Sequence, residues 1–280
     1  MLLITNGKII TMAGDIFEKG YILADEGKII ELGNMEDMPD VNEAGGKKVE
    51  VYDAEGGYIL PGLIDAHCHV GMWEDSIGFE GDDGNEATDP VTPQLRAIDG
   101  VYYADRSFAE ARENGVTTVV TGPGSANVIG GQFAALKTYG RRIEEMIVKE
   151  PVAMKVAFGE NPKTVYNEKR QMPITRMATA ALLRENLMKA VEYKQQLEDY
   201  NKDSENNNKP EFDMKLDALL KVINREIPLK AHAHRADDIL TAIRIAKEFN
   251  LRLTIEHCTE GHLIKDILAE EGVAAVVGPS

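Results

Sequence analysis

From residue 58 onward, short apolar runs alternate with longer segments of helical character, and this alternation constrains the fold more than any other feature. Val116–Thr121 and Val152–Phe158 are rich in β-branched or apolar residues, as buried strands are. Thr175–Tyr200 and Ala236–Phe249 have the length and apolar spacing of helices. Strands that alternate with helices are typical of a parallel sheet with crossover helices. We therefore expect an α/β fold for this part of the chain.

Counted from residue 60, the sequence offers at most seven strands, and the last of them is Val273–Ser280. A closed (β/α)8 barrel needs eight strands. We therefore expect residues 58–280 to form a (β/α)8 TIM-like barrel that lacks its last strand. Leu60–Val70 should be the first strand, followed by a polar loop, Glu74–Asp99. Part of Asn127–Thr138 is expected to be a strand as well.

Residues 1–57 have a different pattern, in which short apolar runs are separated by glycine turns. Asn6-Gly7 and Glu26-Gly27 each lie between two such runs, and these dipeptides are typical of β-hairpins. The pattern predicts a small all-β module at the N-terminus, separate from the barrel.

Composition and charge exclude several classes of function. The formal net charge of −16 at pH 7 would repel phosphates, so we expect no nucleic-acid partner. No apolar run approaches the roughly 18 residues of a membrane span, and Met1–Ile4 is too short for a signal peptide. The two cysteines, Cys68 and Cys258, suggest no disulfide framework and fit a reducing compartment. We expect a cytoplasmic protein with a small-molecule substrate and no membrane partner; a homo-oligomer is compatible with the sequence.

Five of the six histidines lie at or just beyond the carboxyl ends of expected strands. They are His67, His69, His232, His234 and His257. Glu160 follows the end of another expected strand. In a parallel barrel these ends face one mouth, where active sites are built. Imidazole and carboxylate groups are typical ligands of zinc-like ions. The sequence therefore predicts a site for one or two divalent metal ions, with zinc the foremost candidate.

These motifs resemble the metal-dependent amidohydrolase superfamily, in particular its imidazolonepropionase-like branch. The stretch Pro61–His69 resembles the opening strand of that superfamily, and the β-rich N-terminal flank matches too. The later motifs, in the same order, are Ile129-Gly130-Gly131-Gln132, Gly159–Lys163, His232-Ala233-His234 and Ile255-Glu256-His257. The resemblance covers essentially the whole chain. It implies that residues 1–57 form a composite β-sandwich module whose C-terminal partner segment is absent from the sequence.

The resemblance also implies a set of metal ligands. His67 and His69 would bind one metal, His232 and His257 a second, and Glu160 would supply a carboxylate to one or both. Some members of the superfamily use a lysine carboxylated on its amine instead, and Lys155 lies five residues before Glu160. Strand alternation would place Lys155 on the opposite side and deeper in the barrel. We favour Glu160, because it lies at the strand end.

Other polar residues near the expected strand ends are candidates for secondary roles. His234 lies beyond the strand end, where contact with substrate and a hydrogen bond within the loop are both open. Gln132 is a second candidate for substrate binding, as are Asn127, Arg176 and Arg235, although an ordinary loop role fits each of these. Asp65 is expected to support the histidines. Cys68, between two inward histidines, should pack into the barrel wall.

The resemblance implies metal-dependent hydrolysis of carbon–nitrogen bonds, in an amide, cyclic amide or small peptide, through a metal-activated water. The superfamily takes its general base, an aspartate, from the end of the eighth strand. That residue is expected beyond Ser280, so no catalytic base is assigned within the sequence. Two alternatives remain: a ring deaminase of the same superfamily, and a truncated homologue that binds metal without catalysis.

Overall fold

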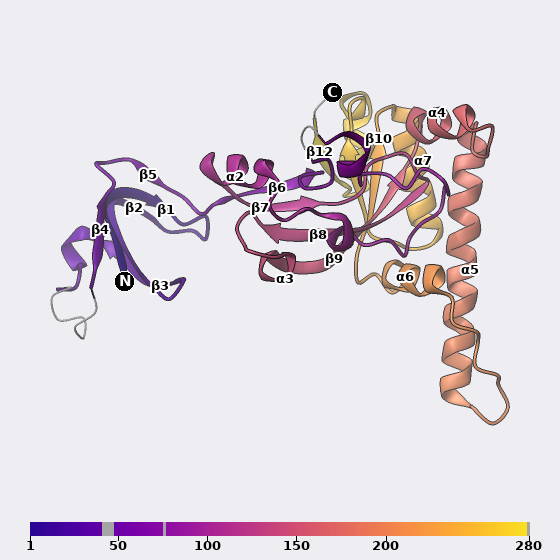
Figure 1. The fold of residues 1–280 in the computed structure, drawn as a ribbon, viewed down its shortest axis with the longest axis horizontal. Helices are drawn as coiled ribbons and strands as arrows, with labels where there is room; N and C mark the ends of the chain where they lie inside the picture. Colours follow the sequence, from indigo (N-terminus) through magenta and orange to yellow (C-terminus); the bar gives the residue numbers. More distant parts are fainter. Residues whose placement is uncertain (41–47, 75–76, 279–280) are drawn as a thin grey trace. The chain divides into compact units, whose positions relative to one another are not determined.

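The computed structural model of the protein describes residues 1–40, 48–74 and 77–278. The chain divides into two units, residues 1–63 and 64–280 (Figure 1). Asp75 and Ser76 of the expected polar loop lie outside the described residues, as do Pro279 and Ser280 of the expected last strand. No helix within the described ranges has the length and apolarity to cross a membrane.

The first unit is built on one five-stranded sheet, with the order β3-β2-β1-β4 and with β5 paired to β1. The strands are β1 Leu2–Ile10, β2 Ile16–Asp25, β3 Lys28–Asn34, β4 Glu50–Asp53 and β5 Tyr58–Ile59. Leu3, Tyr21 and Leu23 form its small buried core. The all-β prediction is confirmed, but over residues 1–40 and 48–63 the structure shows a single sheet and not the two layers of a sandwich.

The two hairpin signals of this unit have different outcomes. Glu26 and Gly27 join β2 to β3 with φ angles of 50° and 76°, the paired positive values of a type I′ turn. Asn6-Gly7, by contrast, lies inside β1, and the pairing of β1 with β2 shifts register on both sides of Gly7. The predicted hairpin is therefore wrong, and the dipeptide forms a bulge. A Cβ at Gly7 would lie 2.2 Å from Cδ1 of Ile59, so a larger residue there would have to displace the Ile59 side chain.

The second unit contains a seven-stranded sheet with the order β12-β11-β10-β9-β8-β7-β6. The strands are β6 Leu63–Cys68, β7 Val116–Thr121, β8 Ile129–Lys137, β9 Ile147–Ala157, β10 Leu229–Ala233, β11 Leu253–His257 and β12 Ala274–Val277. The predicted first strand, Leu60–Val70, is wrong in its bounds, because Tyr58–Ile59 pairs with β1 and β6 begins only at Leu63.

One strand departs from the predicted parallel arrangement. β8 runs antiparallel to both β7 and β9. Its connection to β7 consists of residues 122–128 alone. A parallel crossover needs about a dozen residues or more, so this connection can only reverse the chain. The expectation of an entirely parallel sheet is therefore wrong at this strand.

The sheet curls so strongly that strands far apart in its order face each other. Nζ of Lys230 on β10 donates a hydrogen bond to the carbonyl oxygen of Ala66 on β6, at 3.0 Å. The rings of His67 on β6 and His257 on β11 lie 5.3 Å apart. In a flat sheet, β6 and β10 would be separated by four strand spacings, or roughly 19 Å. The seven strands therefore form a nearly closed barrel.

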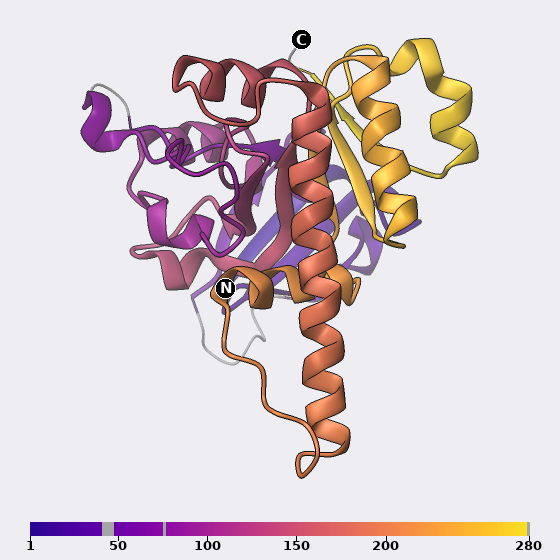
Figure 2. The same cartoon turned by 90° about the vertical axis from the view of Figure 1, so that its right-hand side faces the viewer.

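Helices flank this sheet (Figures 1 and 2). They are α1 Ala97–Gly100, α2 Arg106–Glu113, α3 Ile143–Met146, α4 Glu160–Glu168, α5 Arg176–Lys202, α6 Met214–Ile223, α7 Ala236–Glu248 and α8 Lys265–Glu270. The side chain of Thr175 caps α5 by accepting a hydrogen bond from the amide of Ala178. Leu183 and Leu187 of α5 pack with Leu219 of α6 in the main core.

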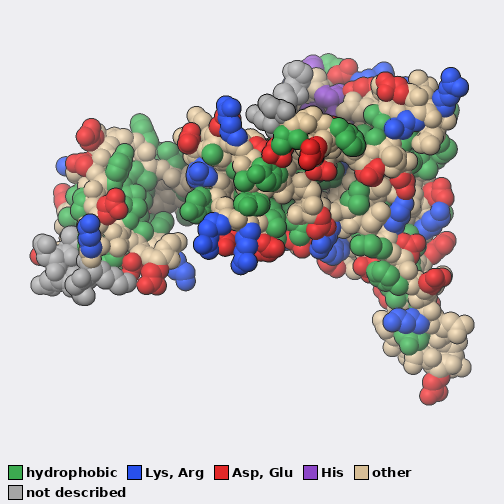
Figure 3. Space-filling model, in the orientation of Figure 1, with side chains coloured by type: hydrophobic (Ala, Val, Ile, Leu, Met, Phe, Trp, Pro, Cys, Tyr) green, Lys and Arg blue, Asp and Glu red, His purple; other side chains and the backbone are tan. Residues whose placement is uncertain are grey.

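Charged side chains of both signs are interspersed over the face of the second unit that Figure 3 shows. Many of them pair within one helix, as Arg106 does with Glu110. The excess of acidic residues is therefore not gathered into a single patch on this face.

Candidate metal centre

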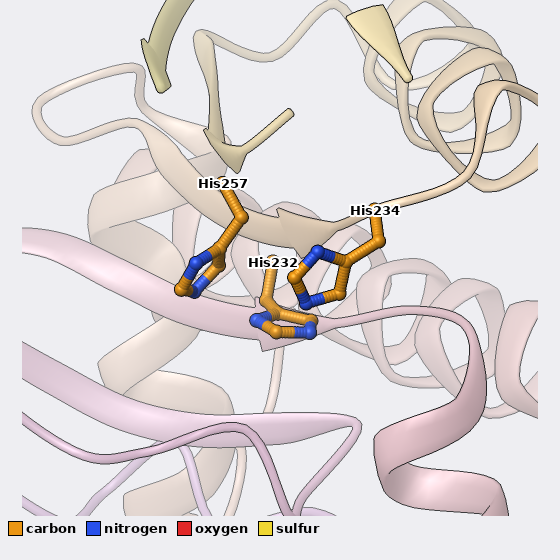
Figure 4. Close-up of side chains that lie close together, drawn as sticks. All are labelled: His232, His234 and His257. Atoms are coloured by element: carbon orange, nitrogen blue, oxygen red, sulfur yellow. The ribbon is translucent and has the colours of Figure 1, made fainter. Parts of the chain in front are cut away.

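Histidine side chains from β6, β10 and β11 converge at the carboxyl end of the barrel strands. The ring of His67 lies 5.2 Å from that of His69 and 5.3 Å from that of His257. The ring of His232 lies 4.5 Å from His257 and 4.6 Å from His234. Figure 4 shows His232, His234 and His257 turned toward one another. The structure thus brings together all five histidines that the sequence singled out.

The backbone delivers these rings by two different means. Lys230 and His232 lie on β10, and His234 follows its end. Each is two residues after the one before, so strand alternation points the three side chains to the same side. On β11, Glu256 points inward, and regular alternation would turn His257 outward. Instead, His257 has a φ of 68° and Cys258 a φ of 46°, in the left-handed region that residues other than glycine rarely adopt. This local strain, of the kind found at functional sites, turns His257 toward the other histidines.

The hydrogen bonds of the rings show which nitrogens are free. Nδ1 of His69 lies 2.7 Å from the carbonyl oxygen of Gly122. A carbonyl only accepts, so Nδ1 carries the proton and Nε2 keeps its lone pair. Nδ1 of His234 is likewise engaged, by Oγ1 of Thr259 at 2.7 Å. Both ring nitrogens of His67 and of His232 are buried without a hydrogen-bond partner among residues 1–40, 48–74 and 77–278.

Unpartnered buried nitrogens are rare in folded proteins and need an explanation. One nitrogen from each of His232, His234 and His257 lies within 4.8 Å of the others, a spacing that a single metal ion can bridge. The donor set therefore fits a divalent ion. We expected His234 to contact substrate or to form a hydrogen bond within its loop; its ring lies in this group of three histidines.

The site also keeps its imidazoles neutral. Burial lowers the pKa of His67, lowers that of His69 to about 4 and lowers that of His232 to about 2. The next cause in all three is the positive charge of Lys155. Neutral imidazole is the form that binds metals, so these histidines are ready to act as ligands at pH 7.

Lys155 and Glu160 occupy very different positions. The Lys155 side chain is fully buried, its Nζ has no hydrogen-bond partner, and burial lowers its pKa to about 7. The side chain of Glu160 is 51% exposed, and its Oε1 lies 4.0 Å from Nε2 of His234. Strand alternation does not relate the two residues as we predicted, because β9 ends at Ala157 and Glu160 begins α4.

Two further buried charges lie beneath the histidines, and the sequence analysis missed both. Lys230 and Glu256 are 5% and 0% exposed, and Nζ of Lys230 lies 3.0 Å from Oε1 of Glu256. Oε2 of Glu256 lies 3.5 Å from Nδ1 of His67. Charged residues at inward positions of otherwise apolar strands were the available signal, since Lys230 precedes His232 by two residues and Glu256 directly precedes His257.

Aromatic side chains line the same region. The ring of Phe133 stacks on that of His67, with centroids 5.6 Å apart and planes 14° apart. Trp73 makes an edge contact with His69 at 5.3 Å. Trp73 is the single tryptophan of the chain and is 39% exposed, so it can report on events at the histidines.

The remaining candidates are engaged in structural contacts. Nε2 of Gln132 donates to the carbonyl oxygen of Pro93, at 3.0 Å. The amide of Asn127 holds the same loop through the carbonyl oxygens of Glu86 and Asp89.

The two arginines pair with neighbouring carboxylates: Arg176 with Asp238, and Arg235 with Asp237. Asp65 accepts from the backbone amide of His67, at 3.0 Å, and so supports the strand rather than an imidazole. Cys68 packs against an apolar cluster of the barrel wall, as predicted.

Comparison with known proteins adds the family. No family model matches the chain. An amidohydrolase of Thermotoga maritima MSB8 superposes with a TM-score of 0.90 and is 42% identical, over 100% of this chain and 70% of that one. The amidohydrolase tasK of Hapsidospora irregularis is 29% identical over 269 residues, which are 89% of this chain and 27% of that protein.

An imidazolonepropionase of Sphingopyxis alaskensis is 41% identical over 69 residues, or 24% of this chain and 16% of that protein. The chain thus spans about a quarter or less of these curated relatives. The assignment to the imidazolonepropionase-like branch stays a prediction. The predicted superfamily is confirmed by the similarity to the Thermotoga protein, which extends over the whole chain. The chain belongs to the amidohydrolase superfamily.

Proposed function

We propose that this chain carries the metal-binding part of a hydrolase that cleaves carbon–nitrogen bonds. Its substrate would be an amide, a cyclic amide or a small peptide. One observation carries the proposal: His232, whose buried ring nitrogens have no hydrogen-bond partner within the described part of the chain, presents one nitrogen within 4.8 Å of a nitrogen of His234 and of His257, at the carboxyl end of the barrel strands. Active sites of such barrels are built at that end. The names of the relatives support carbon–nitrogen hydrolysis as the class of reaction.

The histidines would hold the metal, in one or two positions. His67 and His69 come from the first barrel strand, and His232 and His257 from β10 and β11. His234 is close enough to the last two to join them. Zinc is the ion that best suits a site rich in neutral imidazoles, so we propose it first.

Lys155 is better placed than Glu160 to complete this set. Its buried amine has no partner and lies near enough to His67, His69 and His232 for its charge to lower the pKa of each. With carbon dioxide, the neutral amine would form an N–C bond and lose one proton, giving a carbamate whose oxygens can ligate. Glu160 remains the alternative ligand, next to His234. A ¹³C-carbamate resonance after growth with labelled bicarbonate, absent in Lys155→Met, would separate the two.

A bound divalent ion supplies Lewis acidity and lowers the pKa of water from 15.7 to about 7. The chain's own residues prepare the site for that chemistry. Burial keeps the imidazoles unprotonated, and the carbonyl of Gly122 fixes the tautomer of His69. Phe133 stacks on His67, and Trp73 contacts His69 edge-on. None of the described aspartates is placed as a general base by these contacts.

The test is turnover by the zinc-loaded protein against a panel of simple amides, dipeptides and cyclic ureides, with ammonia release from aminopurines as a separate arm. We expect hydrolysis of at least one amide-type substrate, abolished in His232→Ala and retained in His262→Ala. His262 is the matched control, because it is exposed and its Nδ1 lies 3.1 Å from the carbonyl oxygen of Thr259, outside the group of converging histidines. Ammonia release alone would identify a deaminase. A metal-loaded protein that is inert in both arms would contradict catalysis by this chain.

A further inference from the structure

The two carboxylate oxygens of Glu256 differ in their contacts. Its Oε1 forms an ion pair with Nζ of Lys230 at 3.0 Å and accepts a hydrogen bond from Oγ1 of Thr254 at 2.6 Å. Its Oε2 is buried and has no hydrogen-bond partner in the part of the chain that the structure describes. The side chain is fully buried, in a position where a carboxylate remains charged only if it is paired. Lys230 supplies that pairing and anchors the group.

The open oxygen faces His67. Oε2 of Glu256 lies 3.5 Å from Nδ1 of His67, just beyond ordinary hydrogen-bond length. The His67 side chain is 3% exposed, and neither of its ring nitrogens has another partner. The ring is held from one face by Phe133, which stacks on it. A small closure of this gap would satisfy one buried donor and one buried acceptor together.

In two neighbouring histidines, an oxygen already lies at hydrogen-bond distance from Nδ1. Nδ1 of His69 is held by the carbonyl oxygen of Gly122, and Nδ1 of His234 by Oγ1 of Thr259, each at 2.7 Å. In both cases the oxygen occupies Nδ1, so Nε2 is the ring nitrogen that remains for a ligand. Histidines that ligate metals usually donate their other ring N–H to an oxygen, which fixes both tautomer and orientation.

We propose that Glu256 is the positioning residue for His67: Oε2 accepts the Nδ1–H of His67 and thereby leaves Nε2 as the lone pair that faces the metal. This inference rests on the metal site proposed above. The ion pair with Lys230 and the hydrogen bond from Thr254 both hold Oε1, and they thereby orient Oε2 toward the ring of His67.

The variant Glu256→Gln gives a sharp test, because its neighbours decide how the amide must lie. Lys230 and Thr254 donate to the anchored end, so that end takes the amide oxygen. The NH₂ group then faces Nδ1 of His67 and can only donate. His67 should switch to the tautomer protonated at Nε2, which blocks the lone pair needed by the metal. Thr254→Val is the matched control, since it removes a hydrogen bond to the same carboxylate without reversing the group that faces His67.

The first measurement is ¹⁵N NMR of the metal-free protein labelled on histidine, with His67 assigned by its loss in His67→Asn. We expect the Nδ1–H tautomer in the wild type and in Thr254→Val, and the Nε2–H tautomer in Glu256→Gln. An Nε2–H tautomer of His67 in the wild type would overturn the inference without any variant, so the test survives if Glu256→Gln does not fold.

The second measurement is the affinity for Co²⁺ by competition with a chelator. Glu256→Gln should weaken binding about 10- to 100-fold, while Thr254→Val should change it less. An unchanged tautomer and an unchanged affinity in Glu256→Gln would refute the role of Glu256 alone. A wild-type protein that binds no metal would instead refute the proposed function.

Discussion

Lys155 and Lys230 are direct neighbours on the paired strands β9 and β10, and Lys230 is the one whose Nζ lies within ion-pair distance of Glu256, at 3.0 Å. Lys230 forms an ion pair with Glu256, whereas the buried Nζ of Lys155 has no hydrogen-bond partner among the described residues and lies 5.5 Å from the centroid of the Phe133 ring. A structural core would not retain an unpaired buried amine, because its desolvation is unfavourable. Proteins keep such groups where function needs them.

This difference predicts opposite effects for the same substitution. Lys155→Met should raise the unfolding free energy of the metal-free protein at pH 7 by about 1–3 kcal/mol, because it removes an unsatisfied buried polar group. Lys230→Met should lower it by about 3–5 kcal/mol, because it leaves Glu256 buried and unpaired. Urea denaturation followed by circular dichroism measures both. Destabilisation by Lys155→Met would show that the amine has a structural partner.

The lowered pKa of His69 predicts that the metal-free protein loses stability in mild acid. Its folded pKa of about 4 lies below the ordinary value of 6.5. Between these values the unfolded chain binds a proton that the folded chain does not, so the contribution of His69 is complete above pH 6.5 and is lost as the pH falls toward 4. The loss is about 1.4 kcal/mol per pH unit.

Denaturation at pH 7.5 and 5.0 tests this effect. His69→Asn should reduce the difference between the two pH values by about 2 kcal/mol relative to the wild type. The exposed His262 is again the control, and its replacement by asparagine should leave the difference unchanged. Equal acid sensitivity of His69→Asn and the wild type would contradict the burial of this imidazole.

Trp73 should be sensitive to packing at Gly84. A Cβ at Gly84 would lie 1.9 Å from Cζ2 of the indole, so Gly84→Ala must displace the ring. We expect a loss of about 1–3 kcal/mol in unfolding free energy and a shift in the emission of this single tryptophan. Gly100→Ala is the control, because its nearest atoms are 3.5 Å away, and it should change stability by less than about 1 kcal/mol. Identical emission spectra for the two variants would rule out the close approach.

Arg176 should act on stability through Asp238. Its guanidinium binds both carboxylate oxygens, at 2.9 and 3.0 Å, and the carboxylate is 4% exposed. Arg176→Ala should cost about 1–3 kcal/mol, less than for a fully buried pair because the arginine is 32% exposed. Arg96→Ala, which breaks a pair between side chains that are 45% and 59% exposed, should cost under about 1 kcal/mol. Equal losses in the two variants would argue against a special role for the buried carboxylate.

Much of this architecture was predictable, because local pattern and barrel geometry agree. The strand Val116–Thr121 has the predicted bounds, and histidines at strand ends do converge. The reversal of β8 was not predictable from apolar pattern, which is the same for parallel and antiparallel strands. It follows from the short connection 122–128, whose length becomes clear only when the ends of both strands are known.

Parts of the site were also beyond a motif-based reading. Glu256 and Lys230 are charged residues within otherwise apolar strands. Their ion pair could be recognised only once the neighbouring strands were known. The inward turn of His257 depends on a positive φ, which cannot be predicted from the sequence for a residue other than glycine. The exposure of Glu160 depends on where β9 ends and α4 begins, and element boundaries are the least certain part of such predictions.

The central claim, that the converging histidines form a metal site, is tested most directly by titrating the metal-free protein with Zn²⁺ in a calorimeter and counting bound ions by elemental analysis. We predict one or two ions per chain for the wild type and for His262→Ala, and a loss of at least one ion in the double variant His232→Ala/His257→Ala. Absence of bound zinc in the wild type, or equal zinc content in the wild type and the double variant, would contradict the claim.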